Sequence, residues 1–462
     1  MLHVTAKPER PWVRAGQPDE GTMRFMVDLK AGAADGAELA VCFVLDSSGT
    51  MRRLELDADD LARLVARGQQ RGELRLVETD RERGGAFSGE TLAEAQRTGV
   101  KPIGLAVQAV ERMVEAMPPS ALASVVTFAE REAVVHEGAA REARESLSEA
   151  LGRLVADDTA FDVGDGTCMA GALGRAQDLA ADHARAGRIA RVIVLTDGIV
   201  HDSEETLERM QALREAGISL TTVGIGGEFD EEFLTRAADR GGGDYYYAAD
   251  PAELAAQLSE ELKALTTVAV RRVRVAIQAR DGGAVGEIVQ AAPRLRLFDE
   301  VQESEGWHSV EVGDIGSGAP ASVAVSLGLP DLGVGEHVVG TVRATWETGD
   351  QKEGETQGDV TLRYAPAEEQ AAERSPETEG LFDRLDVYLA EREAQWAKEE
   401  GDLALATRRL ESATRLLRGL GEHELAREFE AHIVEITDGT PDRAARAKRI
   451  KSETRRLSAD EP

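Results

Sequence analysis

The stretch VCFVLDSSGTM, residues 41–51, decides the fold. It begins inside a continuous apolar run, Leu39–Leu45, which has the length of one β-strand. Such runs are typical of strands that are buried on both faces, as in parallel sheets. Similar runs recur at Ala121–Phe128, Ile189–Thr196 and Ile218–Ile225, with amphipathic helical stretches between them. Strands that alternate with helices predict an α/β domain with a doubly wound parallel sheet and helices on both faces.

The helices of this domain are expected at Pro102–Met117, around Leu147–Leu154, at Ala170–Ala181, at Glu204–Ala216 and at Pro251–Leu265. One segment breaks the alternation. Arg52–Gly99 is highly charged and separates the first strand from its helix, so we interpret it as an insertion. We expect it to be helical around Asp59–Arg67 and mobile elsewhere. Because it begins beside the carboxyl end of the first strand, it is placed to cover or gate whatever binds there.

The α/β domain is expected to span residues 38–265, with the insertion at 52–99. Period-two alternation across residues 266–365, as in Val268–Ala279, predicts an antiparallel β-sandwich. The strand-like stretches in residues 1–37 are expected to complete that sandwich. Residues 366–378 form a polar linker, and residues 379–462 are a helical region with three packed helices. The last basic stretch, Arg443–Arg456, is interpreted as a solvated helix that offsets an acidic body.

The charge of the chain excludes several classes of function. Its 54 Lys and Arg against 85 Asp and Glu give a net charge of −31 at pH 7. A general nucleic-acid binder needs a basic face, and an anionic membrane repels an acidic surface. Two cysteines make neither a disulfide scaffold nor a Cys-rich zinc site. No apolar run approaches the ~18 residues of a membrane span, and the N-terminus lacks the apolar core of a signal peptide. We therefore expect a cytoplasmic protein.

Oxygen-bearing side chains follow the buried strands of the α/β domain. Asp46, Ser48 and Thr50 come directly after the first run, Asp197 follows the third, and Thr167 precedes the helix at Ala170. Ligands of open α/β sheets bind at the carboxyl ends of the strands. Oxygen donors without His or Cys suit Mg²⁺, and Mn²⁺ and Ca²⁺ fit the same donors. Two carboxylates and neutral hydroxyls would leave the ion an open position, for which a carboxylate of another molecule is the natural last ligand.

Each piece taken alone has a plainer interpretation. The sequence Asp-x-Ser-x-Thr occurs in turns and helix caps, and Thr-Asp-Gly is an ordinary turn. His201 is expected to be exposed, and Cys168 is expected to pack behind its loop. Asp165 is either a carboxylate that hydrogen-bonds a metal ligand or a loop residue in water. The sequence holds no GxxxxGK[ST], HExxH or GxSxG motif. Nucleotide binding and the common hydrolytic sites are therefore not indicated.

The segments VCFVLDSSGTM, GDGTCMAGAL and VIVLTDG resemble the von Willebrand factor A (vWA) domain with a metal-ion-dependent adhesion site (MIDAS). The resemblance covers Glu38–Leu265, and the closing segment of this range resembles bacterial proteins related to calcium-activated chloride-channel and inter-alpha-inhibitor-like proteins. It implies a doubly wound domain that binds Mg²⁺. The ligands it implies are Asp46, Ser48, Thr50, Thr167 and Asp197. Thr50 stands where the family usually has Ser, which keeps the hydroxyl.

Members of this family mostly bind proteins, and some are intracellular partners of AAA+ ATPases or parts of signalling systems. We therefore expect a metal-dependent protein–protein interaction module that binds an acidic side chain of a partner and is not an enzyme. It would serve as a scaffold or regulator in a bacterial intracellular complex. One alternative is a metal-dependent hydrolase, which would have to use Asp165 or His201 as its base. The other is a structural protein with an unused site.

Overall fold

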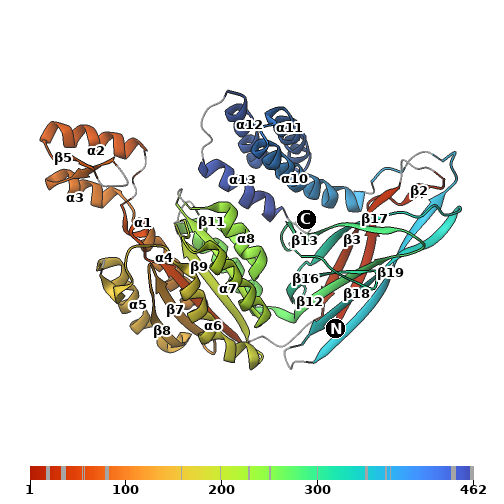
Figure 1. The fold of residues 1–462 in the computed structure, drawn as a ribbon, viewed down its shortest axis with the longest axis horizontal. Helices are drawn as coiled ribbons and strands as arrows, with labels where there is room; N and C mark the ends of the chain where they lie inside the picture. The colour runs from red at the N-terminus through yellow and green to blue at the C-terminus, as the bar shows by residue number, and fades with distance from the viewer. Residues whose placement is uncertain are drawn as a thin grey trace.

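The protein consists of an α/β domain, a β-sandwich and a helical bundle, with a small unit attached to the α/β domain (Figure 1). The computed structural model describes residues 1–16, 21–32, 38–54, 56, 58–78, 83–157, 159–197, 199–226, 229–248, 251–298, 300–348, 352–369, 372–374, 376–438 and 444–457. None of the described helices combines the length and the apolar character needed to cross a membrane.

The α/β domain has a six-stranded sheet with the strand order β11-β10-β9-β4-β7-β8. Its strands are β4 (Leu39–Asp46), β7 (Leu122–Phe128), β8 (Glu132–Ala139), β9 (Ile189–Thr196), β10 (Ile218–Ile225) and β11 (Gly242–Ala248). The sheet departs from the expected all-parallel arrangement at one edge, where β8 runs antiparallel to β7. Only residues 129–131 join these two strands, and a parallel crossover needs a dozen residues or more.

Helices cover both faces of this sheet, as expected for a doubly wound fold. They are α4 (Pro102–Ala116), α5 (Ala140–Ala156), α6 (Met169–Arg185), α7 (Ser203–Glu215), α8 (Glu231–Gly241) and α9 (Pro251–Thr266), with a short 3-10 turn at Ala160–Asp162. Alternate residues of β4 point to opposite faces. Phe43 and Leu45 join the core formed with α4, α5 and α9, whereas Cys42 and Val44 join the core formed with α6, α7 and α8. The continuous apolar run of β4 therefore serves two cores at once.

β4 lies between β7 and β9, so the chain leaves it toward one side of the sheet and later returns to the other. β4 and β9 pair in parallel, with Leu45 opposite Leu195. The residues that follow the two strands therefore emerge side by side. Such a switch point is where open α/β sheets bind their ligands.

The insertion folds as a small unit of two helices and a hairpin that stands away from the sheet (Figure 1). After the short α1 (Gly49–Arg52) it contains α2 (Ala58–Arg71), β5 (Leu74–Glu78), β6 (Arg83–Phe87) and α3 (Gly89–Thr98). The helix expected around Asp59–Arg67 is present as α2. Arg52, predicted to begin the insertion, is instead buried under the first loop of the α/β domain.

The two sheets of the sandwich have the strand orders β1-β3-β17-β13-β14 and β15-β16-β12-β18-β19-β2. The strands of the first sheet are β1 (Leu2–Pro8), β3 (Thr22–Ala31), β13 (Ala284–Ala292), β14 (Arg296–Leu297) and β17 (Ser322–Gly328). Those of the second are β2 (Trp12–Arg14), β12 (Val268–Ala279), β15 (Gln302–Ser304), β16 (Trp307–Gly316), β18 (Gly335–Glu347) and β19 (Glu353–Ala365). The N-terminal strands thus pair with strands that lie beyond the α/β domain in the sequence.

Four described helices form the C-terminal bundle. The three expected packed helices are α10 (Pro376–Glu399), α11 (Leu403–Gly419) and α12 (His423–Asp438), and the basic stretch expected as a further, solvated helix is α13 (Ala444–Arg456). The bundle covers the outer face of the first sandwich sheet. In β3, Phe25 and Val27 point into the sandwich, whereas Met26 shares a core with Phe382 and Phe429 of the bundle. The apolar stripe that the sequence predicts along these helices is therefore core, with two exceptions. Trp396 and Leu403 are 59% and 48% exposed.

The basic helix α13 is docked against the α/β domain, so its interpretation as a solvated helix is wrong. Lys448 Nζ donates to Phe229 O at 2.7 Å. Arg455 pairs with Asp239 of α8 at 2.6 Å. Both basic side chains are buried. The charge pattern of the sequence showed the basic residues but not the acidic helix α8 that they contact.

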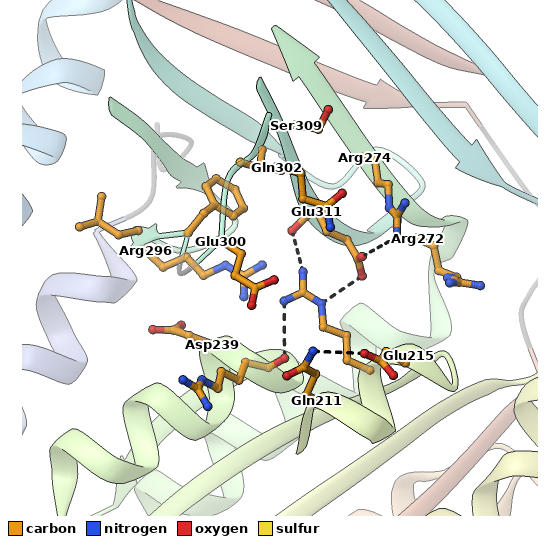
Figure 2. Close-up of a pocket in the computed structure, with 15 residues that line it drawn as sticks. Gln211, Glu215, Asp239, Arg272, Arg274, Arg296, Glu300, Gln302, Ser309 and Glu311 are labelled. Carbon is orange, nitrogen blue, oxygen red and sulfur yellow. Dashed lines mark hydrogen bonds and ion pairs between the residues drawn. The ribbon is translucent and has the colours of Figure 1, made fainter. Parts of the chain in front are cut away.

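A polar joint connects the α/β domain to the sandwich (Figure 2). Arg214 of α7 donates from Nε to the Glu311 carboxylate at 3.2 Å and from Nη2 to the Glu311 carbonyl at 3.4 Å. Beside it lies a cavity of about 360 Å³ that Arg272, Arg274 and Arg296 also line. Arg272 and Arg274 pair with Glu347 and Glu311. The charges of this cavity therefore largely satisfy one another.

Removing the insertion should leave the α/β domain folded. Of the residues that the structure describes between Met51 and Ile103, none belongs to the two cores of this domain. We expect replacement of residues 54–100 by a short Gly-Ser linker to shift the thermal midpoint by no more than about 2–4 °C, measured by circular dichroism. Val110→Asp, which buries a charge in the same domain, is the destabilised control. A deletion as damaging as Val110→Asp would show that the insertion supports the fold.

Candidate metal centre

Asp46 lies at the carboxyl end of β4 and is completely buried. Its Oδ1 accepts a hydrogen bond from the Ser48 backbone N–H at 2.8 Å, and its Oδ2 accepts one from the Thr196 hydroxyl. Burial raises the pKa of the Asp46 carboxyl above its usual value, although the hydrogen bonds from Thr196 and Ser48 oppose this rise. A buried carboxylate is costly unless a cation or donors compensate its charge. The position therefore favours a cation nearby.

Two hydroxyls connect the first loop to Asp197. Ser48 Oγ and Thr50 Oγ1 are 3.1 Å apart, and Thr50 Oγ1 donates to Asp197 Oδ1 at 2.8 Å. Asp197 is 3% exposed, whereas Thr50 lies on the exposed side of the site. Four of the five predicted ligands thus meet at the ends of β4 and β9. All of their donor atoms are oxygens, which suits a hard divalent cation.

The loop that carries Thr167 is joined to the same place through its backbone. The Gly49 N–H donates to Asp165 O at 3.2 Å, and the His201 N–H donates to Thr167 O at 2.9 Å. Asp202, at the start of α7, accepts hydrogen bonds from the first N–H groups of α6, those of Met169 and Ala170. Together these bonds hold the buried Thr167 between the other two loops.

Several residues that shape the site were missed by the sequence analysis. Thr127 donates to Ser47 Oγ at 2.9 Å, and Ser47 Oγ donates to Phe128 O at 3.1 Å. Arg52 donates to the Ser47 carbonyl at 2.8 Å and to the Asp157 carbonyl at 3.0 Å. These bonds fix the loop from beneath. The only local signal was adjacency: Ser47 neighbours a predicted ligand, as does Thr196, which bonds Asp46.

The other candidates near the site fit their plainer interpretations. His201 is exposed, and its Nδ1 lies 3.4 Å from the Thr167 backbone N. Asp165 is exposed as well. Burial raises the pKa of the Cys168 thiol, and the nearby carboxylates of Asp202 and Glu130 raise it further. A nucleophilic Cys needs the opposite shift, so Cys168 is not poised for nucleophilic chemistry.

Residues 94–261 match the model of the von Willebrand factor type A domain. The chain contains a vWA domain. The match begins within the last residues of the insertion, so it includes Thr167 and Asp197 but not the loop of Asp46. Residues 379–460 match a second model, the Sll0103-like C-terminal alpha-helical domain, which fits the bundle α10–α13.

Solved structures share this architecture over nearly the whole chain. A von Willebrand factor type A protein from Catenulispora acidiphila is 18% identical, with a TM-score of 0.71 over 98% of this chain and 96% of its own. The ArnB paralog VWA2 from Sulfolobus acidocaldarius is 14% identical, with a TM-score of 0.50 over 99% of both chains. At these identities the likeness concerns the fold.

Among curated proteins, the uncharacterized protein YfbK from Escherichia coli strain K12 is 28% identical over 148 residues. The matched region is 31% of this chain, and it spans only a quarter (25%) of the relative. This likeness therefore concerns part of each protein and indicates no activity for this chain.

Substitutions of Thr50 should distinguish the contribution of its hydroxyl to metal binding from the contribution of its shape. Thr50→Ser keeps the hydroxyl that contacts Asp197, so Mg²⁺ affinity should hardly change. Thr50→Val keeps the shape but offers no lone pair, so it should weaken Mg²⁺ binding. We expect a loss of at least about tenfold, because even residues that only support the ligands of a metal site cost about that much affinity when they are changed. Isothermal titration calorimetry with Mg²⁺ and Mn²⁺ measures both variants. Equal affinities of the Ser and Val variants would remove Thr50 from the ligand set.

Proposed function

We propose that this protein is a metal-dependent protein–protein interaction module that binds an acidic side chain of its partner through Mg²⁺. The five residues that would hold the ion are Asp46, Ser48, Thr50, Thr167 and Asp197. One observation carries the proposal: the contacts from Ser48 through Thr50 to Asp197, beside the buried Asp46. vWA domains commonly mediate protein–protein interactions, which supports this assignment.

The charges of the donors determine what the site recognises. Asp46 and Asp197 contribute the two carboxylates, and the hydroxyls contribute none. Bound Mg²⁺ would supply an open coordination position with residual positive field. A carboxylate about 4 Å from a unit charge gains ~4 kcal/mol at an effective dielectric of about 20. The net charge of −31 repels acidic partners at long range, but physiological salt screens that repulsion beyond about 8–10 Å. Local attraction therefore dominates at contact.

Binding fits this site better than catalysis. A hydrolase would need a general base near the metal, and the candidates for that role, His201 and Asp165, are exposed loop residues outside any catalytic motif. We propose that the protein is not an enzyme and acts as a scaffold or regulator in a bacterial cytoplasmic complex. An AAA+ ATPase or a signalling protein is the proposed partner. We also propose that the vWA domain is related to the calcium-activated chloride-channel and inter-alpha-inhibitor-like group.

Capture of the partner should depend on the metal site. We expect the tagged full chain to retain a partner from extracts of the native host in Mg²⁺ and to release it in EDTA. Asp46→Ala removes a carboxylate without removing core volume and should fail to retain the partner even in Mg²⁺. Once the partner is identified, changing one of its Asp or Glu residues to Asn or Gln should abolish retention. Quantitative mass spectrometry of the retained proteins measures these effects.

The matched control is Asp178→Ala, which removes an exposed carboxylate of α6 in the same domain. This variant should retain the partner as the wild-type chain does. A partner that stays bound in EDTA and on Asp46→Ala would place the interface elsewhere and refute the proposed function.

A further inference from the structure

A second, larger cavity lies where the helical bundle meets the vWA domain. Its volume is about 680 Å³, and α8, α10, α11, α12 and α13 line it together with the residues around β14. Pockets for small ligands usually occupy ~300–1,000 Å³ and often form between domains. In the fold, α13 runs beside α8 and β11, and the remaining helices of the bundle lie above it (Figure 1). The residues proposed to hold Mg²⁺ do not line this cavity.

Glu391 of α10 is an acidic group on the wall of this cavity. Within the part of the chain that the structure describes, no hydrogen bond or ion pair to its carboxylate is formed. Burial raises the pKa of Glu391 to about 7, and the attraction of Lys451 only partly opposes this rise. The Glu391 side chain is only partly exposed, and a largely desolvated carboxylate without a direct partner gains from any cation that reaches it.

The neighbouring basic side chains are committed to other groups. Lys451 pairs with Glu231 at 3.4 Å, and Arg455 pairs with Asp239 at 2.6 Å. Lys448 donates to Phe229 O, and its Nζ lies 3.8 Å from the centre of the Phe229 ring. The cations of α13 therefore hold the helix on the vWA domain. Arg392 of α10 also lines the cavity and donates to Tyr388 Oη at 3.5 Å. Among the described residues, no basic side chain forms an ion pair with Glu391, which leaves its carboxylate for a cation from outside.

The remaining wall supplies apolar surface. Trp396 lies one helical turn beyond Arg392 on α10 and is 59% exposed at this cavity, beside Leu410 and Ile436. An indole ring binds both apolar groups and, over its face, organic cations. A carboxylate and an aromatic ring that line the same cavity form a combination that recognises an ammonium group carried on an apolar body.

We propose that this cavity binds a small organic cation, with its ammonium group paired to Glu391 and its apolar body against Trp396, Leu410 and Ile436. The assignment is independent of the metal site and of the proposed function.

The test compares three probes with the same apolar body: 2-phenylethylamine, 2-phenylethanol and 3-phenylpropionate. Calorimetry on the full chain at pH 7.5 should show that the amine binds about tenfold or more tightly than the alcohol, the gain of roughly one charge-assisted hydrogen bond. The carboxylate probe should bind more weakly than the alcohol. Glu391→Gln should reduce the amine to the level of the alcohol and leave the alcohol unchanged.

Two further variants serve as controls. Glu411→Gln removes an exposed carboxylate of α11 and should keep the preference for the amine. Ala447→Phe places a ring at the cavity wall and should weaken all three probes. Thermal unfolding verifies that each variant is folded. Equal affinities of amine and alcohol for the wild-type chain, tightest binding of the carboxylate, or a preference that survives Glu391→Gln would each overturn the proposal.

Discussion

Burial of one carboxylate at the end of β4 is the constraint on which the site depends. Asp46 is completely buried, so each of its oxygens needs a donor or a cation. The Ser48 N–H and the Thr196 hydroxyl supply two donors. To present its N–H, the chain must turn sharply after β4, and that turn brings the Ser48 and Thr50 hydroxyls toward Asp197. The geometry of the loop thus follows from the need to solvate Asp46.

The surrounding fold makes this arrangement rigid. Apolar residues of β4 pack into cores on both faces of the sheet, so the strand cannot shift its register without exposing one of them. Arg52 holds the loop from below by hydrogen bonds to the carbonyls of Ser47 and Asp157. None of the described residues of the insertion that follows belongs to either core. The insertion can therefore differ in size or position without disturbing the packing that holds the donors in place.

The sequence predicted those features of the fold and the site that depend on residues close together in the chain. The runs Ile189–Thr196 and Ile218–Ile225 became β9 and β10 with the expected bounds, because a strand buried on both faces must be apolar throughout. The ligand candidates could be named because parallel strands present their carboxyl ends at one edge. Features formed between distant segments had no such signal. The contact of α13 with α8 joins residues more than 200 positions apart in the sequence, such as Arg455 and Asp239. A basic helix in isolation is indistinguishable from a solvated one.

Each of the two proposed sites contains a carboxylate with little access to water, but the groups that surround the two carboxylates differ. At Asp46, hydrogen-bond donors align both carboxylate oxygens, and neutral hydroxyls gather around them. Compact oxygen donors of that kind favour a small, hard cation. At Glu391, no described donor orients the carboxylate, and the neighbouring wall carries the ring of Trp396. An ion as strongly hydrated as Mg²⁺ would lose its water there without gaining enough oxygen ligands, whereas a monovalent ammonium costs much less to dehydrate and gains the ring as well. The surroundings of each carboxylate, rather than its charge, therefore determine which cation it selects.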